Sequence, residues 1–208
     1  MAIKIGILDD HPFIIKGISV VIEQETDMEI LWSAAEERKA WEMLCLHPVD
    51  VFVTDLQLEA TGGGLMVIDH VKSERPDTKI IVLSAHASPY LVRESAQRGA
   101  AGYFKKTDDL DEFIEGIRQT AEAHNEFLGP YRHWAKRNPQ TGITPRERQV
   151  LIEMAKGRSN LEAAEKLGVG VATIKTHLES IYQKLNVSNR TDAVRVALSE
   201  RYFYIDEI

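Results

Sequence analysis

Acidic, hydroxyl and basic side chains follow four short apolar segments in the first part of the chain. In chain order these side chains are Asp9 and Asp10, then Asp55, then Ser84, then Lys105 and Lys106. Clustered carboxylates repel one another unless a cation joins them, and Mg²⁺ prefers oxygen ligands and several waters. If the four segment ends meet, they predict a Mg²⁺ site at which Lys106 and Ser84 contact an anion bound to the metal.

A purely structural interpretation of these residues is also open. A carboxylate just after a strand often caps the following helix, as Asp10 can before Pro12. Such groups at four of five segment ends favour a functional site. We interpret His11 as a loop residue rather than a ligand, and Cys45, which lies in an apolar helical pattern, as part of the core.

The elements that must position these residues alternate between two types. Five apolar, often β-branched segments start at intervals of about 25 residues: 3–8, 28–32, 51–54, 79–83 and 102–104. Amphipathic stretches with helical spacing lie between them and after the last. This alternation predicts an α/β fold, a flavodoxin-like five-stranded parallel doubly wound sheet. Ligands bind at the carboxyl ends of the strands in such sheets.

The chain changes character after about residue 122. Turn signals such as Gly129-Pro130 and a basic cluster indicate a linker over 123–142, with one short helix. Capping boxes at residues 144–147 and 159–162 then mark helix starts. The pattern predicts four helices at about 145–156, 160–167, 171–185 and 190–201, with Gly157 and Gly168 at stops. We therefore expect an α/β domain over 2–122 and an all-α domain over 143–203.

The overall charge is misleading until it is divided between these parts. The 208 residues carry a net charge of −7, which argues against nucleic acid. Cut at Asn125, the first part has a net charge of −10 and the second +3. The single cysteine excludes an internal disulfide, and no apolar run approaches the length of a membrane span. We expect a cytoplasmic protein without membrane insertion.

The first part resembles the receiver domain of two-component response regulators over residues 2 to about 122. The resemblance rests on Asp-Asp-His-Pro at 9–12, Val-Phe-Val-Thr-Asp-Leu at 51–56, Leu-Ser-Ala at 83–85 and Gly-Tyr-Phe-Lys-Lys at 102–106. It implies that Asp55 accepts a phosphoryl group from a sensor histidine kinase. It implies a metal set of Asp9, Asp10, Asp55 and Gln57 for Mg²⁺, and a switch set of Ser84, Tyr103 and Lys106. Lys106 fits the lysine of the family better than Lys105.

The resemblance to the receiver family has departures next to Asp55. Glu59 stands where the family usually has proline, and the segment 60–64 is one residue longer than usual. Gln57 and His86 occupy positions that tune phosphate lifetime in the family, and they leave that lifetime unpredicted.

The second part contains a short helix, a tight turn and a helix with a polar outer face. This pattern fits either an ordinary αα-hairpin or a helix-turn-helix, whose second helix enters the major groove. Motifs at 143–151, 157–160, 173–177 and 184–191 resemble a LuxR-type DNA-binding domain. The resemblance implies a DNA-binding set of Thr173, Lys175, Thr176, Glu179 and Lys184. Glu179 would face the like charge of a DNA phosphate, although a glutamate can accept a hydrogen bond from cytosine.

Together the two parts resemble response regulators of the NarL/FixJ subfamily. This implies a transcription regulator that is not an enzyme, controlled by phosphorylation and dimeric when active on double-stranded DNA. Two alternatives remain open. One is a phosphatase, which would need a second aspartate where Gln57 stands. The other is an atypical receiver that acts through protein contacts, without phosphorylation or with little DNA binding.

Overall fold

The computed structural model describes residues 2–58, 64–123, 126–135, 142–200, 202–203 and 208. The chain divides into two compact units: an α/β unit made mainly of residues up to 136, and an all-helical unit made mainly of the residues from 137 onward. No helix in the described ranges combines the length and apolar content needed to cross a membrane.

The α/β unit is built on five parallel strands. They are β1 (Ile3–Leu8), β2 (Met28–Ala34), β3 (Val51–Thr54), β4 (Lys79–Ser84) and β5 (Gly102–Lys105). The sheet order is β2-β1-β3-β4-β5, which confirms the predicted doubly wound parallel sheet. Leu8 pairs with Thr54, and Ser84 pairs with Lys105. The residues that follow these strands therefore emerge at one edge of the sheet, beside the point where the strand order reverses.

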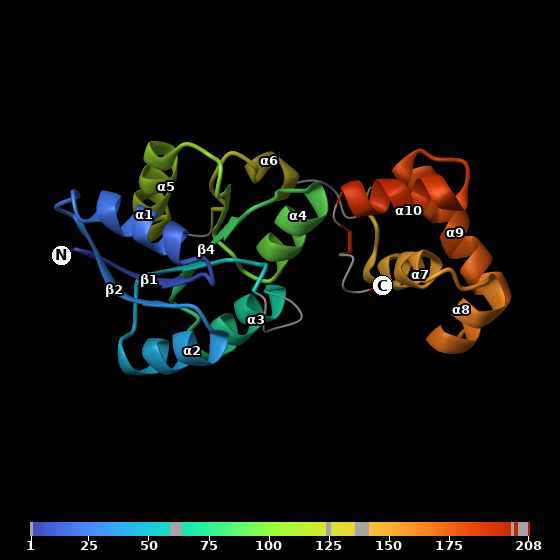
Figure 1. Ribbon diagram of the computed structural model, residues 1–208, viewed down its shortest axis with the longest axis horizontal. Coiled ribbons are helices and arrows are strands. Elements are labelled where there is room, and N and C mark those ends of the chain that lie inside the picture. The colour runs from blue at the N-terminus through green and yellow to red at the C-terminus, as the bar shows by residue number, and fades with distance from the viewer. Residues whose placement is uncertain (1, 59–63, 124–125, 136–141, 201, 204–207) are drawn as a thin grey trace. The chain divides into compact units, whose positions relative to one another are not determined.

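Helices cover both faces of this sheet. They are α1 (Pro12–Ile22), α2 (Glu37–Leu46), α3 (Leu65–Glu74), α4 (Pro89–Gln97), α5 (Leu110–Glu122) and the short α6 (Arg132–Ala135). In Figure 1, α1 and α5 lie on one face and α2 and α3 on the other. Buried residues of α1 and α5, such as Ile18 and Phe113, pack with Ile5, Val53 and Phe104 of the strands. The strands read as continuous apolar runs because both of their faces are covered.

The helical unit consists of α7 (Pro145–Ala155), α8 (Asn160–Leu167), α9 (Val171–Leu185) and α10 (Arg190–Ser199). The capping boxes predicted at Thr144 and Ser159 both form. Gly157 and Gly168 adopt positive φ values of 78° and 65°, as expected for residues that stop helices. Ile174, Leu178 and Ile181 of α9 are buried in the core of this unit.

One expectation about the α/β unit is wrong, and the structure adds a detail to another. Cys45 is exposed rather than part of the core, because the buried face of α2 passes through Ala40 and Leu44 and leaves the next position in solvent. The expected linker does contain a short helix, α6, but Leu128 forms a β-bridge to Gly102 of β5. Residues 126–135 are therefore packed on the α/β unit. Glu59 and most of the lengthened segment after it lie outside the described residues.

A buried ion pair links two helices of the helical unit. Glu147, 4% exposed in its side chain, contacts the Lys184 Nζ at 2.7 Å, and its other oxygen accepts a hydrogen bond from the Ser180 hydroxyl at 2.6 Å. The same carboxylate closes the capping box by accepting a hydrogen bond from the Thr144 amide at 2.7 Å. Burial raises the pKa of Glu147, but the hydrogen bonds from Lys184, Ser180 and Thr144 outweigh it, and the pKa lies below its ordinary value.

Replacing Glu147 with glutamine should lower the free energy of unfolding of the helical unit by about 3 kcal/mol, because it leaves the partly exposed Lys184 ammonium without its charged partner. Hydrogen exchange of α7 and α9 peptides in the full chain measures this loss. A carboxylate with a lowered pKa stabilises the fold above its ordinary pKa, and this contribution disappears as the pH falls through the folded value. The two proteins should therefore differ in stability above the ordinary pKa of a glutamate and converge once the pH falls below the lowered pKa of Glu147.

Glu162→Gln is the matched control for this prediction. Glu162 closes the second capping box with Ser159, but it is exposed and its box has no lysine. It should cost less stability than Glu147→Gln. Equal losses would mean that the capping box, and not the buried ion pair, accounts for the effect.

Candidate functional site

Three carboxylates gather at the carboxyl ends of β1 and β3. Asp9 and Asp55 follow the paired strand ends and are 2% and 1% exposed, and Asp10 is partly buried. Ligand atoms of Asp9, Asp10, Asp55 and the neighbouring His11 all lie within 4.8 Å of one another. The sheet therefore brings Asp55 together with Asp9 and Asp10, which lie 46 and 45 positions before it in the sequence, as the strand-end argument predicts.

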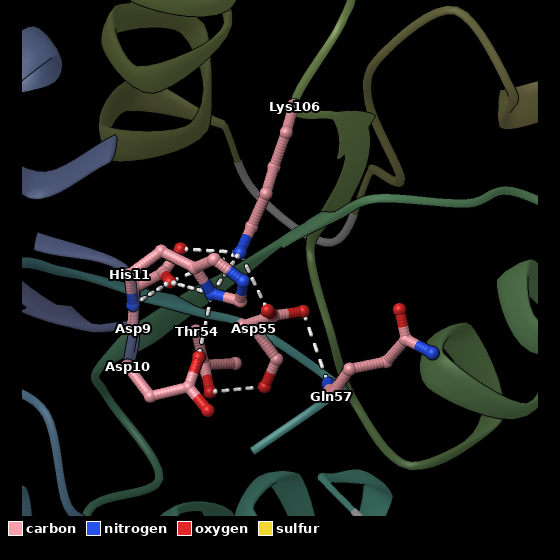
Figure 2. A network of polar contacts seen from close by, with 7 residues as sticks. All are labelled: Asp9, Asp10, His11, Thr54, Asp55, Gln57 and Lys106. Atoms are coloured by element: carbon pink, nitrogen blue, oxygen red, sulfur yellow. Dashed lines mark hydrogen bonds and ion pairs between the residues drawn. The ribbon is translucent and has the colours of Figure 1, made fainter. Parts of the chain in front are cut away.

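Lys106 compensates two of these charges. Its Nζ lies 2.6 Å from the Asp55 Oδ2 and 2.8 Å from the Asp9 Oδ2, and its side chain is 8% exposed (Figure 2). Its backbone N–H donates to the Ser84 carbonyl at 2.8 Å, which fixes the turn after β5 against β4. The neighbouring Lys105 instead has its Nζ 3.5 Å from Asp108. Of the two candidate lysines, the geometry selects Lys106.

The site has fewer positive than negative groups. Burial raises the pKa of Asp55, and the hydrogen bonds from Lys106 and from the Gln57 backbone reverse this only in part. Burial lowers the pKa of Lys106, but its hydrogen bonds to Asp55 and Asp9 raise it above the ordinary value. One ammonium thus stays charged between two buried carboxylates, and a further cation would stabilise their ionised forms.

The residues present fit a divalent cation such as Mg²⁺. Asp9, Asp10 and Asp55 offer hard oxygen ligands, and the shortage of positive charge favours a cation near them. The sequence analysis interpreted His11 as a loop residue rather than a ligand, and the structure places its Nδ1 2.6 Å from the Asp10 Oδ1 and 3.2 Å from the Asp9 Oδ1. The sequence signal for this closeness is the position of His11 directly after two acids. The sequence could not show that its ring turns back towards them.

Gln57 is placed beside this cluster through its backbone. Its N–H donates to the Asp55 Oδ1 at 3.0 Å, whereas its side chain extends away from Asp9 and Asp10 (Figure 2). The Gln57 side chain therefore does not join the carboxylates, and a metal role for this residue would have to use its backbone.

Ser84 and Tyr103 are both fully buried, but they differ in their partners. In the part of the chain that the structure describes, the Ser84 Oγ has no hydrogen-bond partner. A buried hydroxyl without a partner is costly, so a ligand oxygen at this position would satisfy it. The Tyr103 hydroxyl donates to the His86 carbonyl at 2.6 Å, on the loop that follows Ser84. Tyr103 is therefore linked to this site through that loop.

A second candidate site lies on α9 of the helical unit. Thr173, Lys175, Thr176 and Glu179 are all exposed, opposite the buried stripe of this helix. The Thr176 hydroxyl donates to the Ala172 carbonyl at 3.2 Å, within the helix. Lys184 differs from the others, since its ammonium contacts the buried Glu147. Its charge already has a partner inside the unit, and a direct contact with DNA would compete with that ion pair.

Comparison with known families and proteins matches both units. The model described as a response regulator receiver domain matches residues 5–118, and the model of bacterial regulatory proteins of the luxR family matches residues 141–197. The oxygen regulatory protein NreC of Staphylococcus carnosus is 30% identical over 95% of this chain and 98% of its own length. The transcriptional regulatory protein LiaR of Bacillus subtilis is 28% identical over 92% of this chain and 94% of its own length.

Solved structures give the same picture of the fold. The response regulator ChrA of a heme-sensing two-component system has a TM-score of 0.52 at 26% identity, covering 97% of this chain and 99% of its own. The response regulator RcsB of Salmonella typhimurium has a TM-score of 0.71 at 22% identity, covering 93% of this chain and 98% of its own. At that identity, the likeness to RcsB concerns the fold alone.

Two substitutions at the acidic site should change stability in opposite directions. Asp55→Asn should raise the thermal midpoint of the α/β unit at pH 7. The raised pKa of Asp55 means that folding disfavours its ionised form, and asparagine carries no charge to bury. Lys106→Met should lower it by several degrees, because two buried carboxylates lose their shared cation. The three tryptophans, Trp32, Trp41 and Trp134, all belong to the α/β unit, so their fluorescence reports its melting.

The neighbouring Lys105, which is partly buried and pairs with Asp108, provides the control for the second substitution. Lys105→Met should leave the midpoint closer to that of wild type than Lys106→Met does, since Lys105 does not contact Asp55 or Asp9. A stabilising Lys106→Met would contradict the charge balance described above.

Proposed function

The chain belongs to the response regulators that join a receiver domain to a LuxR-family domain, and from this we propose that it regulates transcription by binding DNA under the control of phosphorylation at Asp55. The observation that carries the proposal is the Asp55 carboxylate at the strand edge, 2.6 Å from the Lys106 ammonium and beside two further acids. The donor is a sensor histidine kinase, and the protein works in the cytoplasm as a regulator rather than an enzyme.

The proposed chemistry is transfer of a phosphoryl group to an oxygen of Asp55. The carboxylate oxygen bonds to phosphorus, the bond from phosphorus to the histidine nitrogen of the kinase breaks, and its electron pair stays on that nitrogen. Such a reaction needs alignment and neutralisation of the phosphoryl oxygens more than a protein base. Lys106 supplies a positive charge, and the Ser84 hydroxyl, which has no partner in the described chain, is free to donate to a phosphoryl oxygen.

Asp9, Asp10 and Asp55 are the side chains we assign to Mg²⁺, with Gln57 contributing through its backbone. When bound, Mg²⁺ neutralises oxygens of the phosphoryl group during transfer. His11 adjoins this set through Asp10. Hydrogen bonds in the turns after β4 and β5 support the role of Ser84, Tyr103 and Lys106 as a switch. The Lys106 backbone N–H donates a hydrogen bond to the Ser84 carbonyl, and the Tyr103 hydroxyl donates one to the His86 carbonyl.

The helical unit is proposed to bind double-stranded DNA through the exposed face of α9. Thr173, Lys175 and Thr176 are exposed and suited to groove and phosphate contacts, and Glu179 is suited to reading a cytosine. For Lys184 we propose that it supports α9 from inside, through Glu147. One of the similar structures is a complex of RcsB with DNA, and two others contain RcsB dimers on DNA or RcsB on a promoter with a phosphomimetic. By analogy we propose a homodimer as the active form.

The domain boundaries proposed from the sequence, 2–122 and 143–203, remain our assignment, with one refinement. Residues 126–135 of the expected 123–142 linker are packed on the receiver through β5, so we assign this part of the linker to the receiver. The alternative of an atypical receiver that acts only through protein contacts would leave the buried Ser84 hydroxyl and the charge imbalance at Asp55 without a function.

Acetyl phosphate with Mg²⁺ should add a single phosphoryl group to the wild type and none to Asp55→Asn, as measured by intact-protein mass spectrometry. Asp77→Asn, at an exposed position on the same unit, should be modified like the wild type. Chelation of the metal should abolish labelling. Modification that survives in Asp55→Asn would remove Asp55 from its proposed role.

Lys175→Ala should weaken DNA binding and reduce the slope of log K against log salt concentration by about one unit, because one phosphate contact is lost. Binding of the phosphorylated protein to genomic fragments at several salt concentrations measures the slope. Lys156→Ala, at the end of α7, is the control and should keep the wild-type slope. An unchanged slope for Lys175→Ala would move the DNA contact away from α9.

A further inference from the structure

Residues 126–135, which we call the strap, cover the free edge of β5. The Leu128 N–H donates to the Ala101 carbonyl at 2.8 Å, and the Tyr103 N–H donates to the Leu128 carbonyl at 3.3 Å. An edge strand otherwise presents unpaired backbone groups to solvent, and the strap satisfies some of them. The chain then leaves the strap after Ala135 and reaches the first described residue of the helical unit at Gly142.

The path of the strap is set by Gly129. This residue has a φ of 96°, and a Cβ at this position would lie 2.5 Å from the Tyr103 carbonyl oxygen. Only glycine fits such a close approach without displacing β5. The strap is thus a built part of the receiver, positioned against the backbone of Tyr103.

Tyr131 ties the strap to the turn that carries Lys106. Its hydroxyl donates to the Asp108 Oδ1 at 2.9 Å, while the Asp108 Oδ2 accepts from the Lys105 N–H at 2.8 Å. The Tyr131 ring packs edge-on against Tyr103 with centroids 6.1 Å apart, and the Lys105 ammonium lies 5.6 Å from its centre. The two ends of the turn 105–108 are therefore held by one carboxylate, and Tyr131 binds that carboxylate.

A short series of contacts connects this turn to the proposed phosphorylation site. Asp55 contacts the Lys106 ammonium at 2.6 Å, and Lys106 lies between Lys105 and Asp108 in the turn to which Tyr131 bonds. A phosphoryl group on Asp55 would occupy the space beside that ammonium and change its partners. Because the turn is short and its hydrogen bonds are directional, a shift of Lys106 would strain the hydrogen bond between Tyr131 and Asp108.

We propose that Tyr131 is a positioning residue through which phosphorylation of Asp55 loosens the strap from β5. This inference rests on the proposed function. It assigns the response of the strap to one hydrogen bond, from the Tyr131 hydroxyl to the Asp108 carboxylate, which can be removed without removing the Tyr131 ring.

Hydrogen exchange of the full-length protein, with and without acetyl phosphate and Mg²⁺, tests this proposal while intact mass records phosphate uptake. In the wild type, phosphorylation should speed exchange of peptides covering 126–135 about fivefold, the effect of losing one hydrogen bond of ordinary net strength. In Tyr131→Phe the strap should exchange at the faster rate before phosphorylation and respond little afterwards, with Asp55 still labelled. Tyr182→Phe, the same change in the helical unit, should keep the wild-type response.

Asp108→Asn is the second variant, in case Tyr131→Phe destabilises the receiver. It weakens the acceptor of the same hydrogen bond and should also reduce the response. A merely structural Tyr131 would raise strap exchange by the same factor in both states and preserve the phosphorylation-dependent difference, which would overturn the proposal. Unchanged strap exchange in labelled wild type would overturn it and leave the proposed function intact. If acetyl phosphate adds no phosphoryl group to the wild type, both the proposed function and the role of Tyr131 are contradicted.

Discussion

The contact between the Lys106 ammonium and the buried carboxylates of Asp9 and Asp55 is the constraint on which the receiver depends. Each carboxylate is almost fully withdrawn from water, which is strongly unfavourable without a compensating charge. The three residues follow β1, β3 and β5, so the compensation exists only when all these strands have their native neighbours and register. The sheet order, the covering helices and the turn after β5 all serve to keep these three strand ends together.

Compensation by a single ammonium is incomplete, and this gives the site its chemistry. The raised pKa of Asp55 means that the folded protein holds its carboxylate in an unfavourable environment. The buried Ser84 hydroxyl is also in an unfavourable environment, because it lacks a hydrogen-bond partner in the described chain. Both are features that a cation and a phosphoryl group would satisfy. Active sites commonly retain such unfavourable groups while the hydrophobic core supplies the stability.

The sequence predicts backbone features better than side-chain partners. Strand ends, capping boxes and stop glycines are local signals, and they located Asp9, Asp55 and Lys106 at one edge and four helices after Thr144. The pairing of Glu147 with Lys184 and of Tyr131 with Asp108 joins residues 37 and 23 positions apart, which no local pattern specifies. Cys45 shows a related limit, because an apolar pattern on a short helix fixes its buried face only to within about one residue.

The ion pair of Lys184 also bears on the affinity of the helical unit for DNA. Lys184 directs its charge to Glu147, so the exposed face of α9 presents Lys175 against Glu179 and has little net positive charge. Affinity for DNA depends on neutralised phosphates, so under the proposed function one helical unit with such a face should bind weakly. Two units on adjacent half-sites would raise the effective concentration of the second unit and restore affinity. Under the proposed function, weak single-unit binding is what makes DNA occupancy depend on assembly, and hence on the state of Asp55.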